Sequence, residues 1–246
     1  MTLRLLLLAG TQEAREIARG LADLEGVWSL ASLAGATARP APLAVPCRVG
    51  GFGGDAGFAA FLDTERIDAV VDATHPFAAV MAARAARIAQ ATGRAHLRVL
   101  RPAWEPGPGE AWTHLAREEE AAAHIPPGAT VFLATGRQHL DRFANLAGRH
   151  VIARVIDPPA GPCPVPGARF VVARPPFTRA GETDLFRREG VDWLVAKNAG
   201  GAAGRAKLDA ARDLGLRIGM IERPAPPAAE TAESAGEALE WIRARR

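Results

Sequence analysis

Tyrosine is absent from the 246 residues, aromatic residues make up 6% of them, and the only lysines are Lys197 and Lys207. Proteins that bind nucleic acids typically carry a basic stripe with interleaved aromatic side chains. Here the positive charge is almost all arginine, it is scattered along the chain, and the net charge is only +3. This composition argues against nucleic-acid binding and suits a small polyanionic ligand.

Cysteine is scarce as well. Cys47 and Cys163 lie far apart, and no Cys-x-x-Cys pair or Cys/His metal-binding spacing occurs. We therefore expect two free thiols and no metal site. The apolar run Leu3–Ala9 is far too short to span a membrane and lacks the flanking pattern of a signal peptide. These features predict a cytoplasmic protein without a membrane partner.

Apolar runs alternate with segments of helical spacing along the whole chain. A hydrophobic content of 48% and a charged content of 23% are globular values, and the length suits one large or two smaller domains. Near-continuous apolar runs are typical of parallel strands covered on both faces. Strands are predicted over residues 3–9, 27–33, 45–49, 68–73, 96–100, 130–134, 151–155, 170–172, 193–196 and 217–221. Helices are predicted over residues 12–24, 55–62, 78–92, 178–188, 202–214 and 234–243. The sequence thus predicts an α/β protein with parallel sheets.

The periodicity breaks between Arg101 and Gly109, where three prolines and two glycines occur. Such a segment is typical of a linker or hinge, and a second series of strand–helix units follows it. We therefore predict one domain over residues 1–104 and a second over residues 105–246. The C-terminal helix could pack back on the first domain.

Two glycine-bearing turns in the first half are candidates for phosphate contact. Gly10 and Thr11 stand between a predicted strand and a predicted helix, where backbone amides and the Thr11 hydroxyl could hold a phosphate. The turn is not Gly-x-Gly-x-x-Gly, so a plain tight turn is an equal alternative. Four of the five residues Gly50–Gly54 are glycine, which would let the backbone approach a ligand closely. A flexible turn is the alternative.

The end of the second predicted strand carries no carboxylate. An NAD site usually supplies an acidic side chain here for the ribose 2′-hydroxyl. This sequence instead places Ser32, Gly35, Thr37 and Arg39 in the region, and a hydroxyl with a guanidinium suits a 2′-phosphate. The pattern favours NADP, with an exposed loop and a solvated Arg39 as the alternative.

Polar residues also follow the later strands. The strand that begins at Asp68 stops at Asp72-Ala73-Thr74-His75-Pro76 and is followed by a helix, and ligands of open α/β sheets bind at the carboxyl ends of the strands. In the second half, cationic and polar residues occupy the corresponding positions. They are Thr135, Arg137, Arg174, Lys197, Asn198 and Arg223. Together they suit a carboxylate-rich substrate, although any one of them alone could be an ordinary loop residue.

The segment Asp72–Ala78 resembles the signature of the precorrin-6A reductase family of corrin biosynthesis, which includes the cobalt-precorrin-6A reductases. The resemblance covers nearly the whole chain and is weakest over residues 101–170. It extends to segments 7–14, 32–35, 49–54, 197–201, 207–211 and 221–224. The Asp-Ala-Thr-His-Pro-Phe segment is quite specific, whereas the glycine-rich segments alone would not be.

The resemblance implies an NADPH-dependent reductase of two Rossmann-like domains, with cofactor and tetrapyrrole in the cleft between them. Such enzymes deliver a hydride to C19 of precorrin-6A and a proton to C18, which gives precorrin-6B. The tetrapyrrole would be the partner of this chain, with transient contacts to neighbouring pathway enzymes. Another NADP-dependent reductase or epimerase is an alternative, and so is a non-catalytic two-domain protein that binds an anionic metabolite.

The resemblance implies binding roles for four groups of residues. Gly10, Thr11, Gly51 and Gly53 would hold the pyrophosphate. Ser32, Gly35 and Arg39 would surround the 2′-phosphate, and Thr74 and His75 would line the nicotinamide-ribose site. Arg137, Arg174, Lys197 and Asn198 would hold the carboxylates of the substrate. His75 could act as a general acid, but we favour a positioning role for it, with the proton coming from water.

Overall fold

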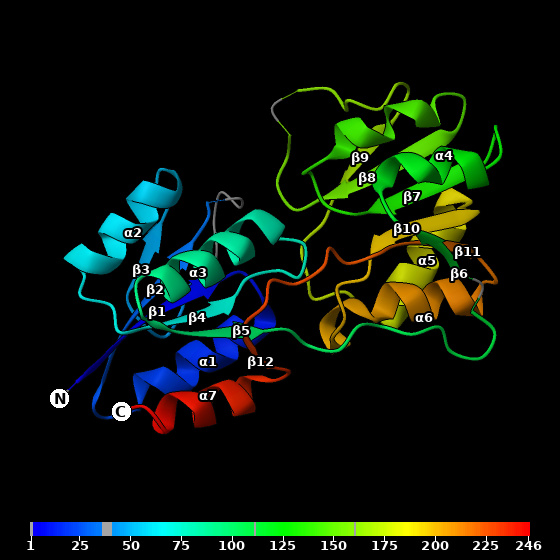
Figure 1. Ribbon diagram of the computed structural model, residues 1–246. Helices are drawn as coiled ribbons and strands as arrows, with labels where there is room; N and C mark the ends of the chain where they lie inside the picture. The colour runs from blue at the N-terminus through cyan, green and yellow to red at the C-terminus, as the bar shows by residue number, and fades with distance from the viewer. Residues whose placement is uncertain (1, 36–40, 111, 160) are drawn as a thin grey trace. The chain divides into compact units, whose positions relative to one another are not determined.

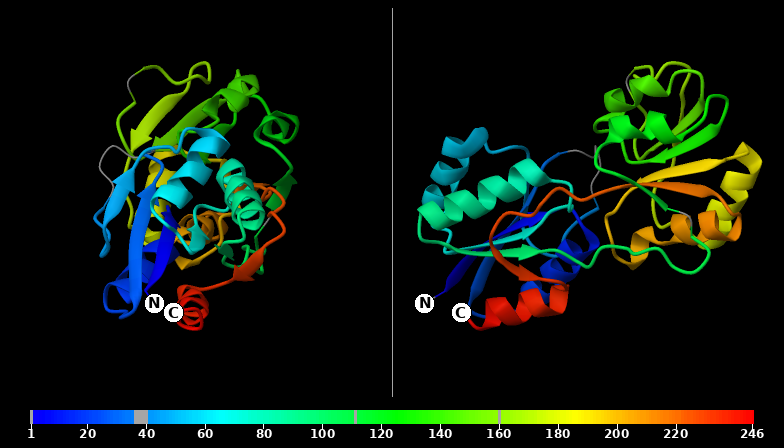
Figure 2. Two further views of the ribbon diagram at one scale, coloured as in Figure 1. Left: turned by 60° about the vertical axis from the view of Figure 1, so that its left-hand side comes forward. Right: turned by 45° about the vertical axis from the view of Figure 1, so that its right-hand side comes forward.

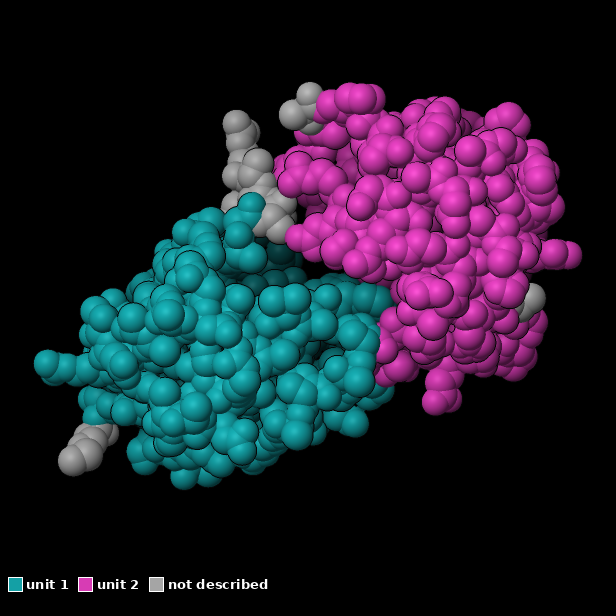
Figure 3. Space-filling view, turned by 45° about the horizontal axis from the view of Figure 1, so that its top comes forward, with its two compact units in different colours: residues 1–102, 224–246 teal, residues 103–223 magenta. Residues whose placement is uncertain are grey.

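The computed structural model of the protein describes residues 2–35, 41–110, 112–159 and 161–246. The chain forms two compact units, coloured separately in Figure 3. Unit 1 comprises Met1–Pro102 and Pro224–Arg246, and unit 2 comprises Ala103–Arg223. The sequence-based boundary lies near residue 104 and assigns residues 224–246 to the second domain, with the C-terminal helix allowed to return. In the structure the whole of that segment belongs to unit 1.

The sheet of unit 1 has six parallel strands in the order β12-β5-β4-β1-β2-β3. Their bounds are β1 (Leu3–Ala9), β2 (Val27–Leu33), β3 (Cys47–Val49), β4 (Ala69–Ala73), β5 (Ala95–Val99) and β12 (Glu230–Ala232). From β1 the order runs outward through β2 on one side and through β4 on the other. The crevice beside the carboxyl ends of β1 and β4 is therefore the switch point at which such sheets bind ligands.

Helices cover both faces of this sheet. Helices α1 (Gln12–Ala22) and α7 (Ala235–Arg243) lie on one face, and α2 (Gly54–Thr64) and α3 (Ala79–Ala91) lie on the other (Figures 1 and 2). Strand β1 shows why its sequence is an unbroken apolar run. Leu5 and Leu7 belong to the core cluster that includes α1 and α7, whereas Leu6 and Leu8 belong to the cluster that includes α2 and α3.

The sheet of unit 2 also has six parallel strands, in the order β6-β11-β10-β7-β8-β9. Their bounds are β6 (Trp112–Leu115), β7 (Thr130–Ala134), β8 (His150–Val155), β9 (Arg169–Val172), β10 (Trp193–Lys197) and β11 (Arg217–Ile221). Helices α5 (Arg179–Glu189) and α6 (Ala206–Asp213) pack on one face. The other face carries the short helices η1 (Glu118–Glu120), α4 (Ala121–His124) and η2 (Leu140–Leu146) (Figure 1).

The two sheets share one topology. In each, five strands follow the order 3-2-1-4-5 and a sixth strand is added beside the fifth. Strand β12 completes unit 1 after the chain has passed through unit 2, and β6 completes unit 2 before the first of its other strands. The predicted pair of Rossmann-like halves with parallel sheets is confirmed.

The sequence did not predict β6 and β12, because Trp-Thr-His-Leu and Glu-Thr-Ala contain no apolar run. The helix predicted over residues 202–214 is interrupted, since the 3₁₀ turn η3 (Ala202–Gly204) precedes α6. Across the described ranges, no helix combines the length and the apolar character that crossing a membrane requires.

Candidate active site

The turn between β1 and α1 lies directly beside the end of β4. A Cβ atom added to Gly10 would lie 3.8 Å from the Cα of Thr74 and 3.8 Å from the backbone nitrogen of His75. Thr11 caps α1, since its Oγ1 accepts a hydrogen bond from Ala14 N (3.2 Å) and donates one to Ala73 O (2.8 Å). The hydroxyl proton is therefore already used, which differs from the expected phosphate contact. The amides of the first turn of α1 remain as donors at this edge.

The glycine-rich loop Gly50–Gly54 leads from β3 into α2. Gly50, Gly53 and Gly54 have φ angles of 122°, 76° and 89°, in the region that glycine adopts far more readily than other residues. Between them, Phe52 anchors the loop by edge-to-face contacts with Phe58 and Phe61 of α2, with ring centroids 4.8 and 5.1 Å apart. The loop thus exposes the backbone of Gly51 and Gly53 while its one aromatic side chain fixes it to the helix.

Arg48 of β3 joins this loop to the end of β2. Its Nη1 donates to Ser32 Oγ (2.8 Å) and to Gly50 O (2.9 Å), and its Nη2 donates to Gly51 O (2.9 Å). The guanidinium also lies over the ring of Phe52 (4.3 Å). No carboxylate among the described residues forms an ion pair with Arg48. A cation without a counter-charge at this corner of the sheet suits an anionic ligand.

The sequence predicts Ser32, Gly35 and Arg39 at this corner and does not indicate Arg48. Ser32 is buried, and Gly35 has a φ angle of 80°, with Val49 at van der Waals distance from the position of a Cβ. Arg39 lies outside the described residues. Arg48 gave no signal in the sequence, because its role depends on contacts with Ser32 of a neighbouring strand.

A buried ion pair holds the segment that follows β4. Asp72 (0% exposed) and Arg98 of β5 (2% exposed) lie on adjacent strands, with 2.7 Å between Asp72 Oδ1 and Arg98 Nη1. Arg98 also donates to the backbone oxygens of Asp72 and His75 (3.3 Å each) and to Thr74 Oγ1 (2.9 Å). Asp72 Oδ1 in turn accepts a hydrogen bond from Thr74 N (3.0 Å). One arginine therefore determines the course of the backbone through Thr74 and His75.

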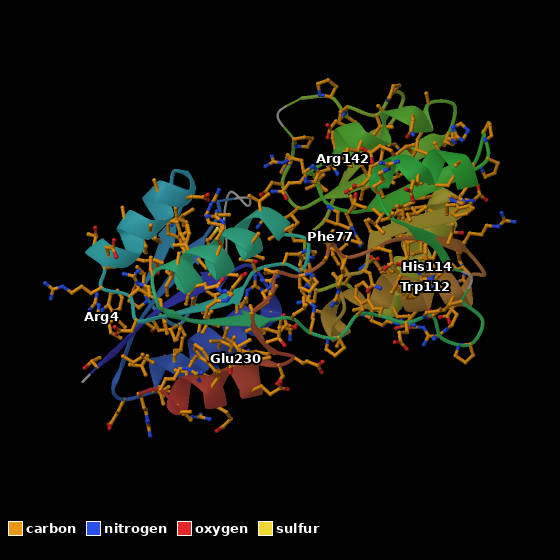
Figure 4. The ribbon with its side chains drawn as sticks, viewed as in Figure 1. Arg4, Phe77, Trp112, His114, Arg142 and Glu230 are labelled. Atoms are coloured by element: carbon orange, nitrogen blue, oxygen red, sulfur yellow. The ribbon has the colours of Figure 1, made fainter. Side chains whose placement is uncertain are left out.

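His75 shapes the turn that enters α3. Its Nδ1 accepts a hydrogen bond from Phe77 N (3.2 Å), and its carbonyl oxygen accepts one from Ala78 N (2.8 Å). Because Nδ1 is an acceptor here, the neutral ring carries its proton on Nε2. The ring of Phe77, labelled in Figure 4, lies 5.7 Å from that of His75. These hydrogen bonds fix the turn, and the positioning role of His75 stays a prediction.

In unit 2, the predicted substrate residues lie in different surroundings. Arg137 is exposed in the turn after β7, and Arg174 after β9 forms an ion pair with Asp157. The side chain of Lys197, at the end of β10, is 11% exposed, with its Nζ 3.6 Å from Glu118 Oε1. Burial lowers the pKa of Lys197, and the nearby Glu118 carboxylate opposes this shift. Arg142, labelled in Figure 4, also pairs with Glu118.

The side-chain amide of Asn198 forms hydrogen bonds with the backbone of Trp104. Its Oδ1 accepts a hydrogen bond from Trp104 N (2.8 Å), and its Nδ2 donates one to Trp104 O (3.0 Å). The residue is buried. Its amide therefore anchors the segment that enters unit 2 after residue 102, instead of being directed at a ligand.

Three comparisons place these features among known proteins. The family model described as "Precorrin-6x reductase CbiJ/CobK" matches residues 4–243. A precorrin-6A reductase of Rhodobacter capsulatus is 45% identical over 240 residues, which is 97% of this chain and 95% of the relative. One of Rhodococcus erythropolis is 44% identical over 241 residues, 97% of each chain. The solved structure of "CobK precorrin-6A reductase" has a TM-score of 0.94 and 45% identity, and the match covers 99% of this chain and 97% of that one.

Proposed function

The chain belongs to the precorrin-6x reductase family, and on this basis we propose that it reduces precorrin-6A to precorrin-6B with NADPH. The overall reaction consumes one NADPH and one proton and releases NADP⁺. The hydride goes to C19 of the macrocycle and the proton to C18. The observation that carries the proposal is the switch point of unit 1, where Gly10 adjoins Thr74 and His75, combined with 45% identity to a precorrin-6A reductase over nearly the full chain.

The residues of unit 1 fit a dinucleotide with a 2′-phosphate. When bound, NADPH supplies the hydride, and the protein supplies position and charge. The amides of Gly10 and Thr11 at the start of α1, with the backbone of Gly51 and Gly53, suit the pyrophosphate. Thr74 and His75 suit the nicotinamide and its ribose.

We assign the 2′-phosphate to Ser32, Gly35 and Arg39, as the sequence predicts, and propose Arg48 as a further contact. Arg48 is tied to Ser32 Oγ and to two loop carbonyls, which orients its guanidinium before any ligand arrives. An oriented guanidinium loses little rotamer freedom when it binds a phosphate. We therefore assign Arg48 the larger share of this contact.

Unit 2 would bind the acetate and propionate carboxylates of the substrate. Arg137 and Arg174 are accessible cations at the carboxyl ends of β7 and β9. Lys197 adds a partly buried ammonium at the end of β10. Asn198 contributes indirectly, by fixing the backbone of Trp104.

The test is turnover. Purified protein with precorrin-6A and NADPH should oxidise one NADPH for each precorrin-6B formed, followed by the absorbance of the cofactor and the mass of the product. With NADPH deuterated at C4, one deuterium should appear at C19. Binding of both compounds without turnover would instead support the non-catalytic alternative.

A further inference from the structure

The hydrogen bond with Arg98 fixes which role the hydroxyl of Thr74 can take toward other groups. A guanidinium can only donate hydrogen bonds, so the 2.9 Å contact with Arg98 Nη1 makes Thr74 Oγ1 an acceptor. The proton of the hydroxyl is left for another group. Within the described part of the chain, no acceptor receives it. Thr74 is half-buried, and an unused donor at such a place invites an acceptor from a ligand.

Arg98 cannot readily turn away from this contact. It is almost fully buried, it is paired with Asp72 on the adjacent strand, and it also donates to the backbone oxygen of His75. Release of the guanidinium would leave a buried carboxylate without its counter-charge, which is strongly unfavourable. The donor role of Thr74 is therefore built into the core of unit 1 and does not depend on a flexible side chain.

The position of Thr74 identifies its partner. Gly10 adjoins Thr74 at the switch point, so a dinucleotide whose pyrophosphate lies on the β1–α1 turn places its nicotinamide half beside β4. The carboxamide of nicotinamide carries a carbonyl oxygen, a good neutral acceptor. We propose that Thr74 donates its hydroxyl proton to the carboxamide oxygen of the nicotinamide, and that Arg98 is the positioning residue that holds Thr74 in this role. The proposal rests on the proposed NADPH function.

The first experiment compares two cofactors in three proteins. NADP⁺ and its thionicotinamide analogue differ only in this acceptor, because sulfur accepts hydrogen bonds weakly. Dissociation constants should be measured for the wild type, T74S and T74V. We expect T74V to weaken NADP⁺ binding about three- to tenfold, the size of one hydrogen bond, and to leave binding of the thio analogue nearly unchanged. T74S should behave like the wild type.

The controls separate this proposal from the function on which it rests. Adenosine 2′,5′-bisphosphate lacks the nicotinamide half, so T74V should bind it as the wild type does. Equal losses for NADP⁺ and the thio analogue, or no loss for either, would overturn the carboxamide contact while NADPH binding stands. Failure of the wild type to bind NADP⁺ at all would overturn the proposed function itself.

A double-variant cycle tests Arg98. R98K keeps a charge opposite Asp72 but has a single donating nitrogen, whereas Arg98 reaches Thr74 Oγ1 and His75 O from two different ones. The preference is the ratio of the Kd for the thio analogue to the Kd for NADP⁺. If Arg98 acts through Thr74, R98K should lower this ratio. The double variant T74V/R98K should then have the same ratio as T74V alone. A purely structural role would lower the melting temperature with the preference unchanged, which would contradict the positioning role. Should R98K fail to fold, the T74S and T74V comparison still decides the hydrogen bond.

Discussion

At the scale of single residues, two arginines organise the strand ends of unit 1: Arg98 holds the segment that follows β4, and Arg48 joins the end of β2 to the glycine-rich loop. Thr74 and His75 stand out because they directly follow an apolar strand. Arg98 lies within Ala-His-Leu-Arg-Val, a pattern typical of a strand whose polar face, with His96 and Arg98, is exposed to solvent. Its burial depends on Asp72, 26 residues earlier, and only the sheet register brings the two together. Arg48 escaped prediction for the same reason.

The 2′-phosphate corner gives a prediction for Arg48. Replacing Arg48 with alanine should raise the Kd for NADPH by about ten- to a hundredfold, since a charge-assisted contact contributes about 1.5–3 kcal/mol. The Kd for NADH should change little. Arg39→Ala is the matched comparison, because the sequence assigned the same task to it. Equal weakening of both cofactors by Arg48→Ala would show that Arg48 only supports the loop.

His75 gives a kinetic prediction. Its Nδ1 is engaged by Phe77 N, so we expect His75→Ala to disturb the turn and raise the KM for NADPH, with a small loss in kcat. General-acid catalysis would predict a loss in kcat on the order of 10²–10⁴. Steady-state kinetics at saturating precorrin-6A distinguish the two roles.

His96 of β5 gives a pH dependence of stability. Burial lowers its pKa below the ordinary value of 6.5, although the nearby Asp72 opposes the shift. As the pH falls below 6.5, His96 becomes protonated in the unfolded chain but stays neutral in the folded chain. The free energy of unfolding therefore decreases, by at most about 1.4 kcal/mol per pH unit. His96→Leu lacks this proton uptake. Denaturant unfolding between pH 7 and 5 should show the wild type losing stability relative to His96→Leu, and parallel curves would contradict the prediction.

At the scale of elements, the strongly apolar strands were predicted with their observed bounds, as for β1, β2, β7 and β11. Strands β6 and β12 were not predicted, since neither contains an apolar run and each forms by pairing with one neighbour, β11 or β5. The glycine-rich loop shows a similar limit. Its four glycines suggested close approach of a ligand, but one neighbouring glycine has a packing role. A Cβ on Gly57 of α2 would collide with the carbonyl oxygen of Phe52.

This collision gives a prediction for Gly57→Ala. Because the obstructing atom belongs to the backbone, the loop must shift, and we expect a destabilisation of about 1–3 kcal/mol together with weaker NADPH binding. Gly236→Ala in α7 is the control, since the nearest atom to its added Cβ is Ser234 Oγ at 3.8 Å; it should keep or slightly raise the melting temperature. Calorimetric melting and cofactor titration of both variants provide the measurement. Wild-type values for Gly57→Ala would show that the loop does not need this glycine.

At the scale of the whole molecule, the sequence predicted two α/β halves and allowed the C-terminal helix to return to the first, but it did not show that the chain already crosses back at Pro224. Unit 1 is discontinuous, and its core includes Ala238, Trp241 and Ile242 of α7 packed with Ile17 of α1. The amphipathic pattern of α7 marked it as a packed helix. The pattern does not indicate which half α7 packs on, because the sheets of both halves have apolar faces.

Removal of the last segment tests this division. A chain ending at residue 223 should lose the cooperative unfolding of unit 1 and its NADPH binding, while unit 2 still melts as a separate transition. A chain that joins residues 1–102 to residues 224–246 through a glycine–serine linker should fold and bind NADPH, because it contains all six strands of the first sheet. Scanning calorimetry and cofactor titration measure both results. NADPH binding by the chain that ends at residue 223 would contradict the essential role of β12 and α7.

The return of the chain to unit 1 also sets an order of events on the ribosome. Domains commonly fold from the N-terminus as synthesis proceeds. Here residues 1–102 are synthesised before unit 2, but they lack β12 and α7 until residues 224–246 have been synthesised. Unit 2 is contiguous and has its full complement of strands before then. Unit 1 is thus begun first and completed last. Until α7 has been synthesised, the apolar face of α1 lacks the helix that covers it.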